Sequence, residues 1–371
     1  MYRLVNNKIM SRRENKKIQK TATGGHKMVG EMRQDLVTGK WVVVATERSQ
    51  KPSDFMMGRK RLQRMAKYKD KCPFCQLDKY PQKPDIVRLP DDNEEWEVHI
   101  FGNKYPAFNP CDEFRSWQLG PYRAIESVGY HEILATRGHD EADAYLTQRQ
   151  MALQIEALEL RYRQLREKPS VSYIQIIKNS GEEAGASLEH PHNQIFTVPV
   201  IPSDVLDILV GAEKYRQQHS ENVFQTIIDW ERREGARVID ENDDFVLFCP
   251  YASRVAYEMW IVPKKHDPYF ENMAPKERDN LAEILRGALA RLYVSLNDPP
   301  YNYYILSAPC DDTGFVSDRK IYKNFRWHIQ ILPRLSKWGG FEMGTGLEIT
   351  SVLPEEAAVY LRGQNIDQLL V

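Results

Sequence analysis

Two stretches of the chain space their apolar residues as amphipathic helices do. In the segment 142–167, Met151, Ile155, Leu158, Tyr162 and Leu165 recur at alternating intervals of four and three residues. This spacing places them on one face of a helix, which we expect to be buried in the core. A second such helix is predicted over 275–296, where a proline suits the first turn. Its apolar face consists of Leu281, Ile284, Leu285, Leu289, Leu292 and Leu296. Helices are also predicted over 202–220 and 354–362.

Short runs of β-branched and aromatic residues predict strands between these helices. They lie at 41–46, 98–106 (a strand running into a turn), 130–136, 171–177, 195–198, 245–248, 257–262, 301–306 and 327–332. The order strand, long helix, strand, loop, His-x-Gln occurs twice, ending at His192-x-Gln194 and at His328-x-Gln330. The chain therefore reads as two diverged copies of one α+β unit.

Length and charge exclude several classes of protein. The chain has 371 residues, with 51 Lys and Arg against 52 Asp and Glu. With charges so nearly balanced, the protein has no strong net electrostatic attraction to nucleic acid or to an anionic membrane surface. No apolar run approaches the ~20 residues that span a bilayer. Five cysteines in this length do not make a secreted disulfide scaffold, and we expect a cytoplasmic protein.

Residues 1–30 differ from the rest of the chain. They contain eight Lys or Arg and one acidic residue, Glu14. They lack the apolar region of a secretory signal. We expect a basic, disordered tail. A transit peptide is the alternative, although the segment is poor in Arg and Ser for one.

The chemistry concentrates in the stretch 185–194, Gly-Ala-Ser-Leu-Glu-His-Pro-His-Asn-Gln. In a strand alternate side chains share a face, so His190, His192 and Gln194 are expected on one side. The preceding loop, 179–187, is rich in Gly, Ala and Ser, and its backbone N–H groups can approach a phosphate closely. The alternative is a solvent-facing polar strand.

Cys72 and Cys75 form a Cys-x-x-Cys knuckle. Two thiolates at this spacing can bind one zinc ion, which needs two further nitrogen or sulfur ligands. Because the chain has only one such pair, the missing ligands are expected to be histidines. A redox-active pair is the alternative.

The string Asn179-…-Gly181-…-Gly185-Ala186-Ser187-…-His190-Pro191-His192-Asn193-Gln194 resembles the active-site motif of galactose-1-phosphate uridylyltransferases. These form a branch of the histidine-triad superfamily, and the resemblance extends from about residue 31 to residue 362. It implies an α+β fold in which two histidine-triad-like halves, 31–215 and 216–371, share one mostly antiparallel sheet with helices packed on it. The second half is degenerate, because Arg326 stands where a metal-binding His would.

The resemblance implies one structural zinc ion per chain. Its ligands would be Cys72, Cys75, His139 and His190. His131, on the strand 130–136, competes with His139 for one position.

It also implies that His192 is the nucleophile, which attacks the α-phosphorus of a nucleotide sugar. A backbone carbonyl near His190 is expected to hold its other ring nitrogen. Gln194 replaces the third histidine of the related hydrolases and cannot transfer protons at neutral pH, which favours transfer over hydrolysis. Ser187 and Asn179 would bind phosphates or sugar.

Further substrate contacts follow from the same resemblance. Arg48 and Lys51 would lie near the nucleotide phosphates, and Asn103 near the nucleoside, although Lys104 replaces an Asp that contacts ribose in many relatives. The segment 337–346 resembles one that reaches across a homodimer to the sugar, through Lys337, Phe341 and Glu342.

Three functions are consistent with these residues. The first is exchange of sugar 1-phosphates on a nucleotide sugar, converting UDP-glucose and galactose 1-phosphate to glucose 1-phosphate and UDP-galactose. The second is a sister reaction on adenine nucleotides, such as that of an ADP-sugar phosphorylase, which Lys104 and Gly344-Thr345-Gly346 keep open. The third is a zinc-containing nucleotide-binding protein without turnover, against which the intact His192 and Gln194 argue.

Overall fold

The computed structural model of the chain describes residues 30–48, 50–57, 66–90, 95–140, 142–310 and 319–369. The basic segment predicted over 1–30 lies outside these residues, apart from Gly30.

Within the described residues, ten strands form one sheet in the order β10-β11-β12-β14-β13-β8-β9-β7-β4-β3, and all neighbours are antiparallel. β8 and β13 pair where the two halves of the chain meet. The sheet is therefore continuous, as expected. Its strands are β3 (Asp85–Leu89), β4 (Val98–Gly102), β7 (His131–Thr136), β8 (Tyr173–Ser180), β9 (His192–Val198), β10 (Val238–Glu241), β11 (Phe245–Phe248), β12 (Met259–Pro263), β13 (Tyr301–Leu306) and β14 (His328–Pro333).

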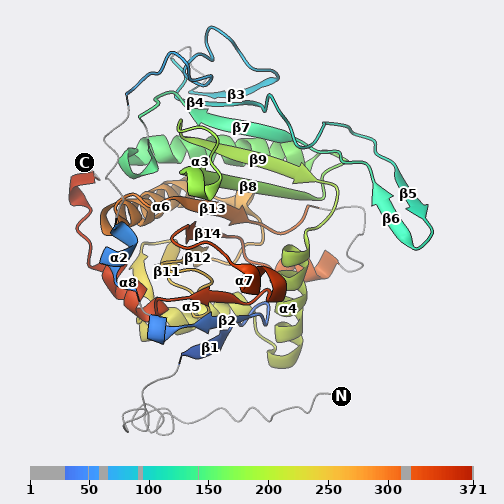
Figure 1. Ribbon diagram of the computed structural model, residues 1–371. Helices are drawn as coiled ribbons and strands as arrows, with labels where there is room; N and C mark the ends of the chain where they lie inside the picture. The colour runs from blue at the N-terminus through green and yellow to red at the C-terminus, as the bar shows by residue number, and fades with distance from the viewer. Residues whose placement is uncertain are drawn as a thin grey trace, which may run out of the picture.

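Two long helices cover one face of this sheet (Figure 1). They are α3 (Gln148–Arg166) and α6 (Pro275–Leu296), and their predicted apolar stripes are buried in the main core. The core also takes the side chains of Ile174 and Ile305 from the sheet. Burial of these faces is the main contribution to the stability of both halves.

Two shorter helices lie against the opposite face of the C-terminal half. α4 (Ser203–His219) packs with Tyr173 and Leu306, which alternate with the core residues of β8 and β13. α5 (Val223–Glu234) packs on β11 and β12. Gly211 lets α4 approach the turn before β2, because a Cβ there would lie 1.8 Å from the Val37 carbonyl oxygen.

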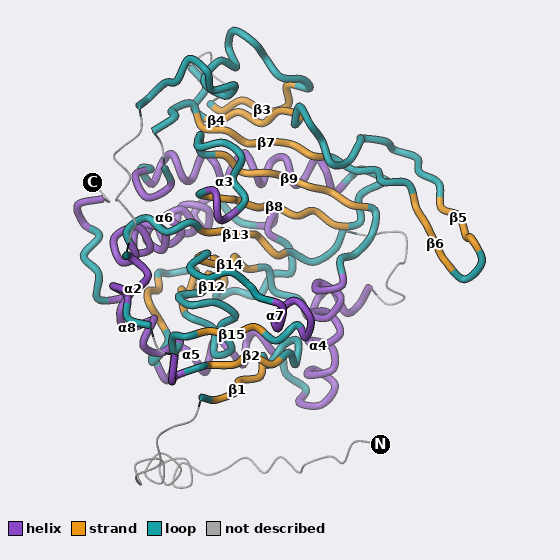
Figure 2. Tube along the Cα trace, in the orientation of Figure 1, coloured by secondary structure: helices purple, strands orange, loops and turns teal. Residues whose placement is uncertain are grey.

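The remaining elements form smaller units. β1 (Glu31–Gln34), β2 (Trp41–Val44) and β15 (Glu348–Thr350) make a three-stranded sheet that joins the start of the described chain to its end (Figure 2). β5 (Ser116–Leu119) and β6 (Tyr122–Ile125) form a hairpin that projects from the body. The short helices are α2 (Pro52–Met56), α7 (Gly340–Thr345) and α8 (Pro354–Arg362).

Several predicted elements have other bounds in the structure, and for two of them the local chemistry gives the reason. The first long helix begins at Gln148 and not at residue 142, because Thr147 caps it: the Gln150 N–H donates to Thr147 Oγ1, and the Thr147 N–H donates to Gln150 Oε1. β9 begins at His192, so His190 precedes the strand. Pro191 has no N–H to donate to the sheet between them. The boundary expected between residues 215 and 216 falls within α4, and the division into two halves stays a prediction.

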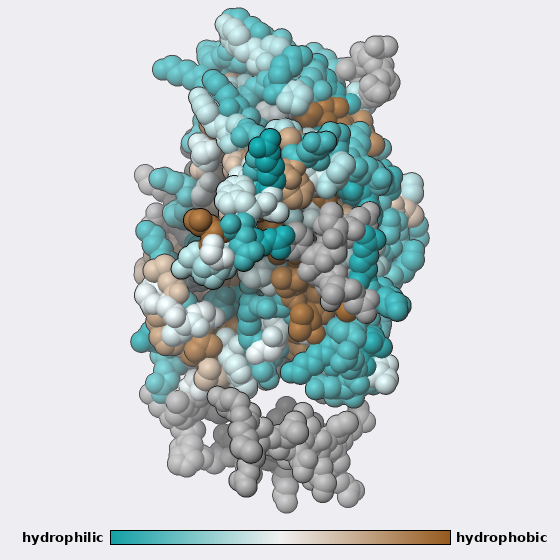
Figure 3. Space-filling view, turned by 90° about the vertical axis from the view of Figure 1, so that its right-hand side faces the viewer, coloured by the Kyte–Doolittle hydropathy of each residue, from teal (hydrophilic) through white to brown (hydrophobic). Residues whose placement is uncertain are grey.

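Within the described residues, no helix is long and apolar enough to cross a membrane. Hydrophilic side chains dominate the face shown in Figure 3, and apolar side chains appear on it in several separate patches.

Candidate active site and metal centre

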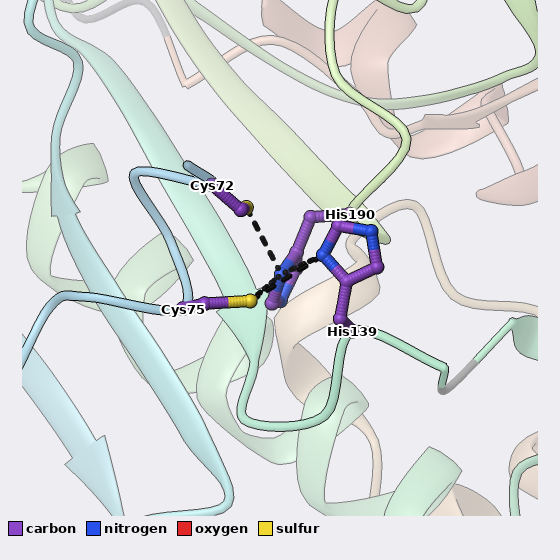
Figure 4. A group of neighbouring side chains, drawn as sticks. All are labelled: Cys72, Cys75, His139 and His190. Atoms are coloured by element: carbon purple, nitrogen blue, oxygen red, sulfur yellow. Dashed lines mark hydrogen bonds between the residues drawn. The ribbon is translucent and has the colours of Figure 1, made fainter. Parts of the chain in front are cut away.

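Four potential metal ligands from three distant parts of the chain meet beside β7 and β9 (Figure 4). The sulfur atoms of Cys72 and Cys75 and the Nδ1 atoms of His139 and His190 all lie within 4.8 Å of one another. Both histidines are buried, with 2% and 0% exposure. His139 follows β7 and His190 precedes β9, so the knuckle closes over the ends of two paired strands.

The separations within this group fit a tetrahedral zinc site. The two Nδ1 atoms are 3.2 Å apart, and three sulfur–nitrogen distances run from 3.4 to 3.6 Å. A tetrahedron with zinc–nitrogen bonds of about 2.0–2.1 Å and zinc–sulfur bonds of about 2.3 Å has edges of roughly 3.3 Å and 3.6 Å for these pairs. The donor set and its spacing therefore match one zinc ion.

The protonation of His190 also suits a ligand. Its Nε2 lies 2.8 Å from the Thr136 carbonyl oxygen, which can only accept a hydrogen bond. The ring proton of the neutral imidazole is thus on Nε2, and Nδ1 presents its lone pair to the centre of the group. Of the two histidines that the sequence left as alternatives, His139 belongs to this cluster and His131 does not. Position favours His139 as the ligand, because His131 lies at the opposite end of β7.

His192 begins β9 opposite Ala135 of β7 and is only 4% exposed. Its Nδ1 lies 2.8 Å from the carbonyl oxygen of His190, the acceptor expected from the sequence. Because a carbonyl accepts, Nδ1 carries the proton and Nε2 carries the lone pair. Burial lowers the pKa of His192, and the bond to the His190 carbonyl opposes that shift only in part. The ring is therefore neutral and nucleophilic at Nε2 near pH 7.

The contacts of Asn193 show on which side of the sheet His192 and Gln194 lie. Its Nδ2 donates to Gln154 of α3 at 3.2 Å, and its Oδ1 accepts from the Tyr303 hydroxyl at 2.5 Å. Both partners belong to the helix-covered side. His192 and Gln194, which alternate with Asn193, accordingly face the other side, where Phe74 of the knuckle packs 5.4 Å from the His192 ring.

The small-residue loop before His190 is held close to the end of β8. The side-chain NH₂ group of Asn302 donates to Asn179 Oδ1 and to the Ala184 carbonyl oxygen, each at 2.8 Å. Gly181 and Gly185 have φ values of +86° and +83°, a region that favours glycine. Asn179 and Ser187 both line a cavity of about 740 Å³ beside this loop.

Gln194 contacts a ring nitrogen of His131 on the neighbouring strand β7, and Asn103 also lies beside that nitrogen. Gln194 Oε1 lies 2.9 Å from His131 Nε2, and the same ring nitrogen lies 2.9 Å from Asn103 Nδ2. Asn103 follows β4, and its N–H donates to the His131 carbonyl. Sequence reasoning placed Asn103 at a strand end and His131 near the metal, but it missed these contacts. These contacts depend on the register between β4, β7 and β9, and the spacing of residues within the motif does not determine that register.

Comparison with known proteins agrees with this geometry. The family model for the N-terminal domain of galactose-1-phosphate uridyl transferase matches residues 19–202, and a model of a domain of unknown function matches residues 131–360. An ADP-glucose phosphorylase from Arabidopsis thaliana is 32% identical over 335 residues, which cover 90% of this chain and 92% of that protein. The chain belongs to the galactose-1-phosphate uridylyltransferase family.

Other members of the family show the same overall similarity. A galactose-1-phosphate uridylyltransferase from Thermotoga maritima is 28% identical over 348 residues, covering 91% of this chain and 99% of that protein. A solved structure of an ADP-glucose phosphorylase from Arabidopsis thaliana with bound ADP-glucose superposes with a TM-score of 0.75 at 29% identity, over 91% of this chain and 99% of that one. This chain is accordingly a nucleotidyltransferase of the family.

Five residues that the family resemblance assigned to substrate belong to the segments before and within the short helices α2 and α7. Arg48 ends the 3-10 turn η1 (Thr46–Arg48), and Lys51 precedes α2, which packs through Phe55 on Tyr257 of the C-terminal half. Lys337 is exposed before α7, and Phe341 is 49% exposed. Glu342 accepts from the Gly339 N–H at 2.8 Å and caps α7. Their substrate roles stay predictions.

The C-terminal half repeats the local geometry around His192, and its described residues hold no group of potential metal ligands. His328 Nδ1 lies 2.9 Å from the Arg326 carbonyl, as His192 Nδ1 does from the His190 carbonyl. The Arg326 guanidinium donates to the carbonyl oxygens of Pro263 and Lys264 and to Gln225 Oε1. It connects the end of β12, the start of α5 and the approach to β14, the segments that correspond to those joined by the cysteine and histidine ligands in the first half.

Proposed function

We propose that this chain transfers a nucleotidyl group from a nucleotide sugar to a phosphate acceptor through a covalent intermediate on His192. The observation that carries the proposal is the 2.8 Å contact between His192 Nδ1 and the His190 carbonyl oxygen, which requires the ring proton on Nδ1 and leaves the lone pair on Nε2. His192 Nε2 forms a bond to the α-phosphorus, and the bond from that phosphorus to the oxygen of the departing sugar 1-phosphate breaks. An incoming phosphate oxygen then reverses the step.

The surrounding residues act on charge and position. The Nδ1–H bond to a carbonyl stabilises the cationic ring of the intermediate. The Gln194 amide donates to a phosphoryl oxygen of the transferring group. Ser187 and the backbone N–H groups of the glycine-containing loop bind the phosphate that does not react. Because a phosphate acceptor is already anionic, it needs no general base, and the absence of a proton-transferring side chain at position 194 is no disadvantage.

We assign the metal group to one structural zinc ion per chain, held by Cys72, Cys75, His139 and His190. When bound, the ion joins the knuckle to the ends of β7 and β9 and takes no part in bond formation. Its mechanistic contribution is positional: His190 is both a ligand and, through its carbonyl oxygen, the hydrogen-bond acceptor for the nucleophile.

Two donor nucleotides are compatible with the site. Adenine is favoured by the Arabidopsis relatives, because one is named ADP-glucose phosphorylase and a solved structure of such an enzyme holds ADP-glucose. Lys104 stands where many uridylyl enzymes have an Asp that contacts ribose, which also favours a different nucleoside. On this proposal His192 accepts AMP from ADP-glucose, and inorganic phosphate accepts it to give ADP. The second candidate is the UDP-glucose and galactose 1-phosphate exchange, which the Thermotoga relative supports.

The experiment is a two-by-two comparison of donors and acceptors. ADP-glucose and UDP-glucose are each incubated with inorganic phosphate and with galactose 1-phosphate, and products are separated by anion-exchange chromatography. The adenine proposal expects ADP and glucose 1-phosphate as the fastest products. UDP-galactose as the fastest product would establish the uridylyl reaction instead. No transfer from either donor would contradict both proposals.

We further propose that the protein is a homodimer in which Lys337, Phe341 and Glu342 of one protomer approach the sugar bound by the other. The support is the family resemblance together with the exposure of Phe341. Sedimentation should show a dimer, and Phe341→Ala should raise the KM for the sugar nucleotide while the wild-type zinc content is retained. A monomer with full activity would contradict this arrangement.

A further inference from the structure

The ring of His131 is held in one orientation by three contacts. It stacks on Phe196 with 4.0 Å between the ring centroids and 27° between the planes. Its Nδ1 accepts from the Ala107 N–H at 3.1 Å, and its Nε2 lies 2.9 Å from Gln194 Oε1. His131 and Phe196 are paired residues of β7 and β9, so the backbone register brings the ring beside Gln194.

The Ala107 contact decides which nitrogen of His131 carries the proton. A backbone N–H can only donate, so Nδ1 must offer its lone pair. The proton of the neutral ring is then on Nε2. Burial lowers the pKa of His131, which keeps the ring neutral at physiological pH. The ring accordingly presents an N–H donor to Gln194.

That donor selects the orientation of the Gln194 amide. Oxygen and nitrogen of a glutamine side chain have nearly the same shape, and the hydrogen-bond partners determine which way the amide points. Because His131 Nε2–H requires an acceptor, Gln194 turns its oxygen to His131 and leaves its NH₂ group to donate. The reverse orientation would direct a carbonyl oxygen at an anionic phosphoryl group.

The Asn103 amide nitrogen also lies 2.9 Å from His131 Nε2, but it cannot form a hydrogen bond to a protonated Nε2. Asn103 Oδ1 accepts from the Tyr105 N–H at 2.9 Å, so its NH₂ group faces His131 Nε2. One ring nitrogen cannot donate to Gln194 and accept from Asn103 at once. With the proton on Nε2, the Asn103 amide hydrogens are left to a substrate acceptor, in agreement with the nucleoside-side role expected for this residue.

We propose that His131 is a positioning residue that fixes the Gln194 amide with its NH₂ group toward the transferring phosphoryl group. This inference rests on the proposed nucleotidyl transfer for its kinetic consequence, but the proton arrangement that it states does not depend on activity. His131 does not touch the reacting atoms and acts through Gln194.

The direct test is the tautomer of His131 in the zinc-bound wild-type protein. Nitrogen-15 NMR of protein with labelled histidine, assigned by comparison with His131→Gln, should show a protonated Nε2 and an unprotonated Nδ1. A protonated Nδ1 would overturn the inference, whatever the substrate proves to be. Crystals of His131→Phe, which keeps the stack but removes the donor, should show the Gln194 amide turned or released.

A double-mutant cycle separates positioning from general structural loss. His131→Phe should lower the transfer rate by up to about 10²-fold, since the oriented donor at Gln194 is lost. In the Gln194→Ala background the same substitution should change the rate by less than about twofold. His131→Gln, whose amide can supply a donor near the position of Nε2, should recover part of the rate. Equal losses in both backgrounds would contradict the inference.

His219→Phe is the matched control. His219 also stacks on an aromatic ring, that of Tyr215, with 4.3 Å between centroids, but it is exposed on α4. This variant should transfer at the wild-type rate. If the wild-type protein transferred from neither ADP-glucose nor UDP-glucose, the proposed function would fail, and the tautomer measurement would still decide the orientation.

Discussion

His190 connects the cluster of potential metal ligands to His192, the proposed nucleophile: its Nδ1 lies 3.2 Å from His139 Nδ1 in the cluster, and its carbonyl oxygen lies 2.8 Å from His192 Nδ1. Because both interactions belong to one residue, movement of the cluster changes the position of the acceptor that sets the protonation of His192. The zinc ion proposed here would therefore affect catalysis without contacting substrate.

Loss of a cysteine ligand should uncouple this arrangement. In Cys72→Ser we expect the zinc content to fall from about one equivalent per chain. The free energy of unfolding should fall by about 5 kcal/mol or more, because the metal joins three distant segments. Metal analysis and denaturant unfolding measure the two effects. Cys111→Ser, at an exposed cysteine outside the cluster, is the control and should change neither. A native protein without zinc and of full stability would contradict the assignment.

Replacement of Gln194 by His should convert transfer in part to hydrolysis. Water is a poor nucleophile that benefits from a general base, an effect of about 10²–10⁴-fold. In Gln194→His, release of nucleoside monophosphate in the absence of acceptor should rise, and the reaction with phosphate should weaken. The assay follows monophosphate release from the donor nucleotide. A wild-type intermediate that hydrolyses as fast as it transfers would contradict the role given to Gln194.

Breaking the buried ion pair between Lys178 of β8 and Asp143 should cost more stability when one member is removed than when both are replaced. Lys178 Nζ lies 2.8 Å from Asp143 Oδ1, with side-chain exposures of 3% and 2%, and the Tyr301 hydroxyl donates to Asp143 Oδ2. Asp143→Ala leaves the Lys178 ammonium buried without its partner and should cost about 3–5 kcal/mol. The double variant Asp143→Ala/Lys178→Met should recover much of this loss in urea unfolding. A double variant less stable than Asp143→Ala would contradict the pairing argument.

The long helices and the cysteine pair of the ligand cluster could be predicted from the sequence because each has a local pattern, whereas His139 and His190 came from the family resemblance. The stripe from Met151 to Leu165 predicts a buried helical face, and the Cys72–Cys75 spacing predicts a metal ligand pair. The carbonyl acceptor for His192 was also predictable, since an imidazole that attacks through one nitrogen must donate through the other. All three are properties of residues close together in the chain or of one motif.

Other features depend on contacts between distant residues. β2 (residues 41–44) pairs with β15 (residues 348–350), and no local sequence pattern predicts this pairing. The role of His131 requires the register between β7 and β9. The sequence showed that Arg326 replaces a metal-binding histidine in the second half. Its hydrogen bonds to Gln225 and to the carbonyl groups at the end of β12 could be found only from the packed structure.

The most direct test of the central claim is detection of the covalent intermediate on His192. The purified zinc-bound protein is incubated with ADP-glucose or with UDP-glucose, quenched at alkaline pH and analysed by mass spectrometry of its peptides. We expect one nucleoside monophosphate per chain on the peptide that contains His192, removed on addition of phosphate or sugar 1-phosphate. His192→Asn should fold, bind zinc and carry no adduct. An adduct on another residue, or transfer at the wild-type rate by His192→Asn, would contradict the account.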